Sequence, residues 1–186
     1  DILYKVSVEG VLGTTSNAVS GIYFDSRDVR IDSLYVAQKG EIFDGHNFIY
    51  QAINNGAKTI VCEKFPDVII EGIVYVLVLN SSKALGTIAA NFYDNPSQNM
   101  ILVGVTGTNG KTTIATLLYE LFSKEGFVTG LLSTVKIAYG RKKFENHHTT
   151  PDAVTLNKYL HKMLDAGVSH CFMEVSSHGI NQNRIE

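Results

Sequence analysis

Cysteine, proline and tryptophan are scarce in this 186-residue chain, which has two cysteines, three prolines and no tryptophan. Cys62 and Cys171 lie far apart without metal-ligand spacing, so they form no disulfide framework and favour a reducing compartment. Neither sign of charge dominates, because 16 Lys and Arg stand against 18 Asp and Glu, which argues against a dedicated nucleic-acid-binding protein. The longest apolar stretch, residues 68–79, is interrupted by Glu71 and Gly72 and is too short to span a bilayer. We therefore expect a cytoplasmic protein with neither a nucleic-acid nor a membrane partner.

What the sequence does contain is an α/β pattern. In the first half, β-branched and aromatic runs typical of strands occupy residues 22–24, 34–37, 59–62 and 73–79. Apolar residues at helical spacing predict a helix over residues 47–55 and another over 81–93, the second capped by Ser81 or Ser82.

A cluster of turn-forming residues at 94–99 indicates the boundary between two domains, 1–96 and 97–186. In the second domain, strands alternate with helices, which is the pattern of a parallel sheet with right-handed crossovers. The predicted strands are residues 100–106, 128–133 and 170–175, with a hairpin over 135–145.

Two helices are predicted in the second domain. The first covers residues 112–125 and is expected to bury one apolar stripe, made of Ile114, Leu117, Leu118, Leu121 and Phe122. The second starts at Thr150-Pro151-Asp152, where Thr150 would cap, Pro151 would take the first position and Asp152 would favour the helix dipole.

A phosphate-binding loop joins the first strand and helix of the second domain. Residues Gly104-Val-Thr-Gly-Thr-Asn-Gly110-Lys111-Thr112 fit the pattern G-x-x-x-x-G-K-[ST], with a strand before and a helix after. Gly107 and Gly110 let the backbone curl so that successive N–H groups face phosphate oxygens beside a helix N-terminus. Lys111 would reach the β- and γ-phosphates, and the Thr112 hydroxyl would be a magnesium ligand. The fold class is therefore α/β, with a small N-terminal α/β domain followed by the first part of a P-loop parallel-sheet ATPase domain.

Glu174 is the candidate for the carboxylate that a P-loop needs to help hold magnesium. It comes at the end of a predicted strand, and ligands of parallel sheets bind beyond the carboxyl ends of strands. A buried carboxylate without a cation would be costly. Glu174 could hold magnesium directly or through a water; the alternative is a surface acid on an edge strand.

Three motifs taken together resemble the Mur ligase family: Thr106-Gly-Thr-Asn-Gly-Lys-Thr-Thr113, His148-Thr-Thr-Pro-Asp152 and Glu174-Val-Ser-Ser-His-Gly179. Asp25-Ser26-Arg27 and the segment 39–45 resemble the N-terminal substrate domain of the members that add a third amino acid. The resemblance covers nearly the whole chain and implies an ATP-dependent ligase of peptidoglycan precursor synthesis. ATP would phosphorylate UDP-MurNAc-L-Ala-D-Glu, and the amine of diaminopimelate or lysine would attack the acyl phosphate.

The resemblance also implies a role for individual residues, with ATP and Mg²⁺ as cofactors. ATP would bind at Gly107, Thr108, Asn109, Gly110, Lys111, Thr112 and Thr113. Lys111 and Glu174 would be catalytic, and Thr112 and Glu174 would serve magnesium. The UDP-MurNAc-dipeptide would contact Phe24, Ser26, Glu41, Ile42, Phe43, Thr149, Thr150, Ser176, Gln182 and Arg184, although residues 41–43 depart in type from the family pattern.

Two other interpretations stay open. The P-loop alone does not separate this ligase from a folylpolyglutamate or cyanophycin synthetase, and the chain could be a nucleotide-binding module without catalysis. The second domain shows three main strands, fewer than a P-loop sheet normally needs, and it lacks the lysine that the family carbamylates. We therefore interpret the chain as an incomplete and inactive portion of a longer ligase. The sequence predicts neither the oligomeric state nor the choice between diaminopimelate and lysine.

Overall fold

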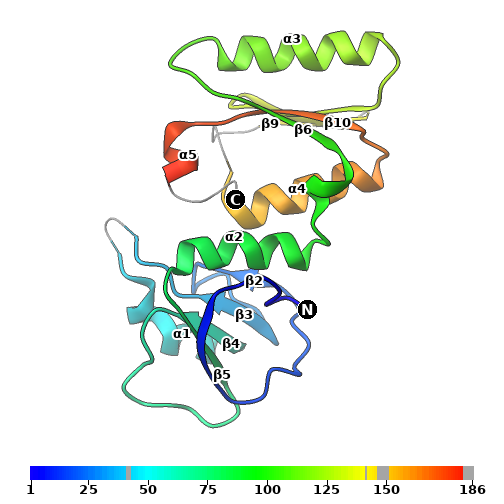
Figure 1. Ribbon diagram of the computed structural model, residues 1–186. Coiled ribbons are helices and arrows are strands. Elements are labelled where there is room, and N and C mark those ends of the chain that lie inside the picture. The colour runs from blue at the N-terminus through cyan, green and yellow to red at the C-terminus, as the bar shows by residue number, and fades with distance from the viewer. Residues whose placement is uncertain (41–42, 141, 146–150, 182–186) are drawn as a thin grey trace. The chain divides into compact units, whose positions relative to one another are not determined.

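The computed structural model describes residues 1–40, 43–140, 142–145 and 151–181 (Figure 1). The chain divides into two compact units, Leu3–Ile88 and Ala89–Glu186, so the division lies inside helix α2, Ser81–Phe92. Within the described residues each unit has one five-stranded sheet with parallel pairs, which confirms the predicted α/β class. No helix of these residues is long and apolar enough to cross a membrane.

The N-terminal unit is built on a sheet with the strand order β1-β5-β4-β3-β2. Its strands are β1 Val8–Leu12, β2 Ile22–Tyr23, β3 Ser33–Val36, β4 Ala57–Cys62 and β5 Val74–Val78. Strands β2 to β5 pair in parallel, and β1 pairs antiparallel with β5 at the edge. Strand β1 was not predicted, because its side chains lie outside the core on both faces and so show no apolar alternation.

Short helices follow β3 in this unit. The predicted helix 47–55 is a 3₁₀ turn, η1 Gly45–Phe48, followed by helix α1 Ile49–Asn54. Ile49 and Ala52 of α1 are buried in the same core cluster as Tyr35, Ile60 and Tyr75 of the sheet. This packing fixes α1 beside the carboxyl end of β2 and the turn that follows.

The predicted cap of helix α2 is wrong by one residue. The helix begins at Ser81, but its cap is Asn80, whose side-chain oxygen accepts the Lys83 N–H at 2.8 Å. Ser81 is buried, and both its N–H and its hydroxyl donate to Glu63 Oε1 at 2.8 Å. Tertiary contact with Glu63 therefore uses the hydroxyl that the sequence assigned to capping.

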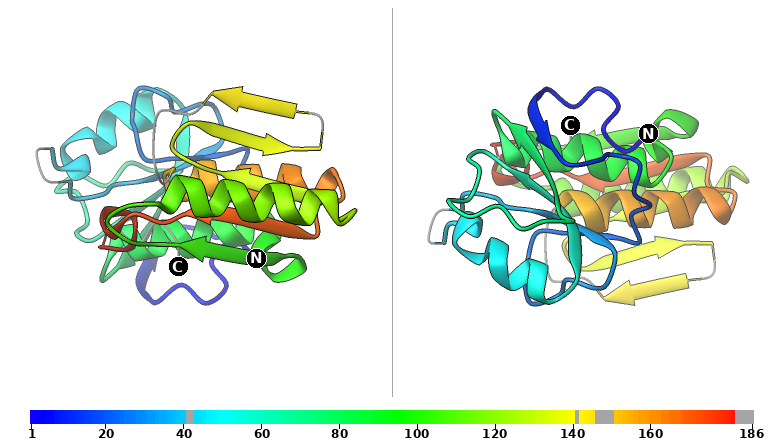
Figure 2. Two further views of the ribbon diagram at one scale, coloured as in Figure 1. Left: turned by 90° about the horizontal axis from the view of Figure 1, so that it is seen from above. Right: turned by 90° about the horizontal axis from the view of Figure 1, so that it is seen from below.

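The second unit has the strand order β6-β10-β7-β8-β9. The strands are β6 Ile101–Val105, β7 Thr129–Leu132, β8 Lys136–Tyr139, β9 Lys142–Glu145 and β10 His170–Glu174. Strands β6, β10 and β7 are parallel, as predicted. The antiparallel pair β8–β9 is the predicted hairpin, and Figure 2 shows it at the edge of the sheet opposite β6.

Helices cover both faces of this sheet: α3 Lys111–Lys124 on one side and α4 Ala153–Asp165 on the other (Figure 1). Neighbouring strand residues face opposite sides, so Leu131 joins the core cluster under α3 and Leu132 joins the one under α4. The 3₁₀ turn η2 Pro96–Asn99 precedes β6, and the short helix α5 Ser177–Asn181 follows β10.

The predicted buried stripe of α3 is partly wrong. Ile114, Leu117 and Leu121 are 49%, 59% and 53% exposed. The residues that face the sheet are Ala115, Leu118, Tyr119 and Phe122, which also recur at helical spacing. Periodicity identifies two neighbouring stripes on this helix, and the position of the sheet decides between them.

The start of α4 also differs from its prediction. Asp152 is the N-cap, with its side chain accepting the Thr155 N–H at 2.9 Å, and the helix begins at Ala153. Pro151 therefore precedes the cap, and Thr150 lies outside the described residues. A carboxylate cap is the stronger choice here because it bonds the free N–H groups and also complements the helix dipole.

Candidate functional site

The phosphate loop runs from the end of β6 to the first turn of α3. Gly107 has a φ of +144° and Gly110 a φ of +80°, conformations that residues with a Cβ rarely adopt. A Cβ at Gly107 would come no closer than 3.7 Å to its neighbours, so backbone conformation and not space requires glycine there. Gly110 is the N-cap of α3 and provides no side-chain bond, which leaves first-turn N–H groups for an anion.

Lys111 lies back over this loop. Its ammonium donates to the carbonyl oxygen of Gly107 at 2.7 Å and to that of Thr108 at 3.5 Å. Asn109 and Gly110 are exposed, whereas Thr112 on the first turn is half-buried. The loop therefore combines one positive charge with the N-terminus of a helix in an exposed segment, an arrangement that suits phosphate.

Glu174 lies beside the start of the loop. Strand β10 is interior, between β6 and β7, and Glu174 is paired with Val105, the last residue of β6. The carboxylate is only 1% exposed, so the alternative of a surface acid on an edge strand is ruled out. The N–H of Thr134 donates to Glu174 Oε1 at 2.8 Å, and the Thr134 hydroxyl donates to Oε2 at 3.0 Å.

This end of the sheet offers few protein ligands for a metal. Among the described residues, no three His, Cys, Asp or Glu side chains lie close enough together to hold an ion. One hydroxyl, on Thr112, and one carboxylate, on Glu174, are what the sequence predicted. Such a sparse oxygen set fits Mg²⁺, which keeps several waters and takes further ligands from substrate phosphates.

The N-terminal unit has a separate pocket of about 440 Å³. It brings together three predicted substrate residues, Phe24, Ser26 and Phe43. Further side chains of the lining are Asp25, Arg27, Tyr35, Gln38, Phe48 and Gln51. Aromatic walls with a few polar groups are typical of a small-molecule site. Glu41 and Ile42, also predicted, lie outside the described residues.

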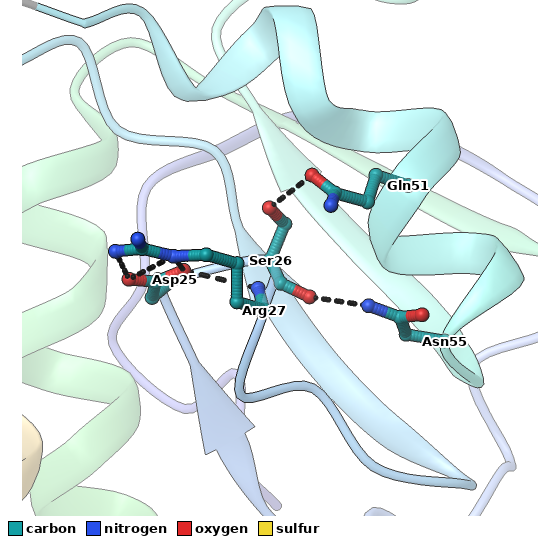
Figure 3. Close-up of polar contacts among 5 residues, drawn as sticks. All are labelled: Asp25, Ser26, Arg27, Gln51 and Asn55. Atoms are coloured by element: carbon teal, nitrogen blue, oxygen red, sulfur yellow. Dashed lines mark hydrogen bonds and ion pairs between the residues drawn. The ribbon is translucent and has the colours of Figure 1, made fainter.

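Ser26 is held from helix α1, as Figure 3 shows. Its hydroxyl donates to Gln51 Oε1 at 2.8 Å, and its carbonyl accepts from Asn55 Nδ2 at 2.8 Å. Sequence reasoning missed Gln51 and Asn55, although their spacing of four residues places them on one face of a helix. A polar pair four residues apart at the end of a short helix was the available signal.

Asp25 and Arg27 form an ion pair on either side of Ser26 (Figure 3). The distance between Arg27 Nη2 and Asp25 Oδ2 is 2.6 Å, and Arg27 Nε donates to Oδ1 at 2.9 Å. The guanidinium lowers the pKa of Asp25, mainly through these side-chain hydrogen bonds. The Arg27 side chain is 80% exposed, so the ion pair lies at the accessible rim of the pocket.

The turn that carries Phe43 is anchored by residues without a sequence signal. His46 Nδ1 is 2.6 Å from Asp44 Oδ1, and its Nε2 accepts the Glu63 N–H at 2.9 Å. The Tyr35 hydroxyl donates to the Gly45 carbonyl at 3.0 Å, and burial raises the pKa of Tyr35 to about 12. One local and two tertiary contacts thus hold one wall of the pocket in place.

The other predicted substrate residues are only partly described. Ser176 is half-buried, two residues beyond Glu174, and its Oγ accepts the Gly179 N–H at 3.0 Å at the start of α5. Thr149, Thr150, Gln182 and Arg184 lie outside the described residues.

Two family models match this chain, and both describe Mur ligases. The model described as "Mur ligase family, catalytic domain" matches residues 18–93, and "Mur ligase middle domain" matches residues 105–186. A UDP-N-acetylmuramoyl-L-alanyl-D-glutamate--2,6-diaminopimelate ligase of Cytophaga hutchinsonii is 52% identical over 186 residues, which are 100% of this chain and 38% of the relative. The ligase of the same name from Phocaeicola vulgatus is 47% identical over 184 residues. The chain spans about 38% of the length of these curated relatives.

Solved structures agree with these matches. A structure of a UDP-N-acetylmuramoyl-L-alanyl-D-glutamate--2,6-diaminopimelate ligase has a TM-score of 0.75 and covers 94% of this chain and 36% of its own. At 24% sequence identity, this similarity shows only that the two chains share a fold. The MurF ligase of Thermotoga maritima, solved in complex with ADP, has a TM-score of 0.53 at 26% identity and covers 84% of this chain and 32% of its own. Through the two matched models and relatives that extend over its whole length, the chain belongs to the Mur ligase family.

Proposed function

We propose that the full-length protein is an ATP-dependent ligase that joins diaminopimelate to UDP-MurNAc-L-Ala-D-Glu through an acyl phosphate. The observation that carries the proposal is the placement of a buried carboxylate, Glu174, next to Val105, where strand β6 ends and the phosphate loop begins. The names of relatives up to 52% identical support the substrate and favour diaminopimelate over lysine.

In this mechanism the loop holds the triphosphate and neutralises its charge. The N–H groups of residues 107–113 and the Lys111 ammonium would bind the β- and γ-phosphates, with Lys111 exchanging its bonds to loop carbonyls for phosphate oxygens. Thr112 and Glu174 would hold Mg²⁺, which supplies charge neutralisation on the phosphates. Phosphoryl transfer depends mostly on such positioning and on electrostatic stabilisation.

The reaction balances in two steps. A carboxylate oxygen of the dipeptide attacks the γ-phosphorus, the bond to the β-phosphate oxygen breaks, and ADP leaves. The amine of the amino acid then attacks the acyl carbon, loses a proton and expels inorganic phosphate, which leaves an amide. Phosphate is a far better leaving group than an oxide ion, so ATP cleavage drives amide formation.

The pocket of the N-terminal unit would hold the uridine end of the substrate. Phe24 and Phe43 provide apolar walls, Ser26 provides a fixed hydroxyl, and Arg27 provides a cation at the rim for an anionic group. In this proposal the pocket of the N-terminal unit binds the nucleotide-sugar, and the phosphate loop of the second unit binds ATP.

Two measurements on the full-length protein test the proposal. Calorimetry should show binding of UDP-MurNAc-L-Ala-D-Glu, and an assay with ATP and diaminopimelate should release ADP and phosphate together with the tripeptide. Turnover with lysine but not with diaminopimelate would change the proposed amino-acid substrate and would still show a ligase. Binding of a folylpolyglutamate or a cyanophycin peptide in place of the UDP-sugar would assign the protein to another member of the superfamily. Nucleotide binding without any amide product would contradict catalysis.

A further inference from the structure

The turn between β7 and β8 reaches Glu174 from a different part of the sequence. Thr134, on this turn, lies 40 residues before Glu174, and its N–H and hydroxyl each donate to one carboxylate oxygen, at 2.8 Å and 3.0 Å. Figure 1 shows that β10, whose end carries Glu174, lies in the middle layer between α3 and α4. The contact therefore joins two strand ends at the same edge of one sheet.

The turn itself is closed by a second set of bonds. The N–H and the hydroxyl of Ser133 both donate to the Lys136 carbonyl at 3.0 Å, and the Lys136 N–H donates to Ser133 Oγ at 3.2 Å. Ser133 is fully buried. Thr134 is thus presented by a rigid turn, and little of its conformational freedom remains to be lost when it holds the carboxylate.

We propose that Thr134 is the positioning residue that sets the orientation of the Glu174 carboxylate for a magnesium–nucleotide complex. A glutamate side chain has three rotatable bonds, and two donors from one turn fix both of its oxygens. A carboxylate has about four acceptor sites, so it can accept hydrogen bonds and still ligate a cation. Ligands whose own orientation is fixed by a neighbour bind metals more tightly. The inference rests on the proposed function, because it assumes that Glu174 serves magnesium.

The test uses the full-length protein and measures ADP affinity by calorimetry, once with Mg²⁺ and once with a chelator. The ratio of the two affinities is the magnesium enhancement. Thr134→Val keeps the shape and the N–H but removes the hydroxyl, and should lower that enhancement by about tenfold, since hydrogen bonds to charged groups are among the strong ones. ADP affinity without metal should be unchanged, and Thr134→Ser should restore the enhancement.

Thr87→Val is the matched control, because it removes a half-buried hydroxyl in the N-terminal unit and should leave both affinities as in the wild type. A second readout is the EPR spectrum of bound Mn²⁺, which should broaden in Thr134→Val and recover in Thr134→Ser. Glu174→Gln gives the loss of magnesium enhancement that is expected when the carboxylate ligand itself is removed.

The outcomes separate the inference from the proposed function. An unchanged enhancement in Thr134→Val, beside a loss in Glu174→Gln, overturns the positioning role and leaves the ligase standing. Loss of metal-free ADP affinity in Thr134→Val, or failure of Thr134→Ser to recover, shows a structural role only and also overturns it. A wild-type protein that binds ADP without any magnesium enhancement contradicts the proposed function itself.

Discussion

The two candidate sites of this chain are organised in opposite ways. In the N-terminal pocket, side chains bond one another: Ser26 to Gln51, and Asp25 to Arg27. In the phosphate loop, the backbone makes the site, and the ammonium of Lys111 donates to two carbonyls of the loop itself. The pocket needs partners from two elements, such as Ser26 and Gln51, which are 25 positions apart, whereas the loop is formed by nine consecutive residues.

This difference determines what each site tolerates. A backbone site depends on glycine conformations and on one cation, so substitutions there should change binding strongly and folding little. A side-chain pocket depends on tertiary contacts, so substitutions there should change stability and affinity together. Glu174 combines the two cases, because a strand end places it and a distant turn holds it.

The largest expected effect tests the phosphate loop. Lys111→Ala should lower kcat for amide formation by about a hundredfold or more, because it removes a charge that stabilises the transferring phosphoryl group. The Tm should change little, since Lys111 bonds carbonyls of its own exposed loop. Lys124→Ala, at the other end of α3, is the control and should remain active. Full activity in Lys111→Ala would show that the phosphate loop has no role in catalysis.

Glycine conformation is tested by a matched pair. Gly110 and Gly126 have φ values of +80° and +91°, and neither has a neighbour that a Cβ would contact closely. Alanine at either position should therefore cost about 1–2 kcal/mol of unfolding free energy. Only Gly110→Ala should also weaken ADP binding, by about tenfold for a cost near 1.4 kcal/mol. Equal ADP affinity in the two variants would show that the loop does not contact phosphate.

Ser26→Ala tests the pocket. Loss of the bond to Gln51 should lower the unfolding free energy by about 1 kcal/mol. KM for the UDP-substrate should rise severalfold while KM for ATP stays constant. Ser20→Ala removes a hydroxyl that donates to the Ile31 carbonyl outside the pocket, and should leave both KM values unchanged. A rise in the KM for ATP would contradict the assignment of the two ligands to separate units.

The smallest effect concerns the ion pair. The folded-state pKa of Asp25 is lowered below its unfolded value of about 3.9, so its contribution to stability is present above that value and is lost as the pH falls through the folded pKa. Asp25→Asn should lower the Tm slightly at pH 7, and the difference should shrink as the pH falls below about 3.9 and vanish below the folded-state pKa. In an Arg27→Ala background the same substitution should have a smaller effect, because only the hydrogen bond from the residue 27 backbone N–H to Asp25 Oδ1 is then left. A pH-independent difference would show a packing role instead.

Local signals predicted most of the secondary structure and misplaced its details. The parallel strands and the hairpin 135–145 were predicted, because apolar runs and turn residues act over a few positions. The cap of α2 and the buried face of α3 were not, because Glu63 and the sheet, both distant in sequence, decide them. The exposed strand β1 had no signal, since it is recruited only by pairing with β5.

The sequence by itself determined the candidate phosphate loop, because a contiguous motif contains all the glycines and donors that the loop needs. It also identified Glu174 as the candidate carboxylate, because this residue ends a predicted strand. Only the tertiary structure decided that Thr134 holds Glu174 and that Gln51 holds Ser26. The physical reason is that hydrogen bonds between residues 40 or 25 positions apart require strands and helices to be packed first. The linear chain shows that Gln51 and Asn55 share a helix face, but not that Ser26 is their partner.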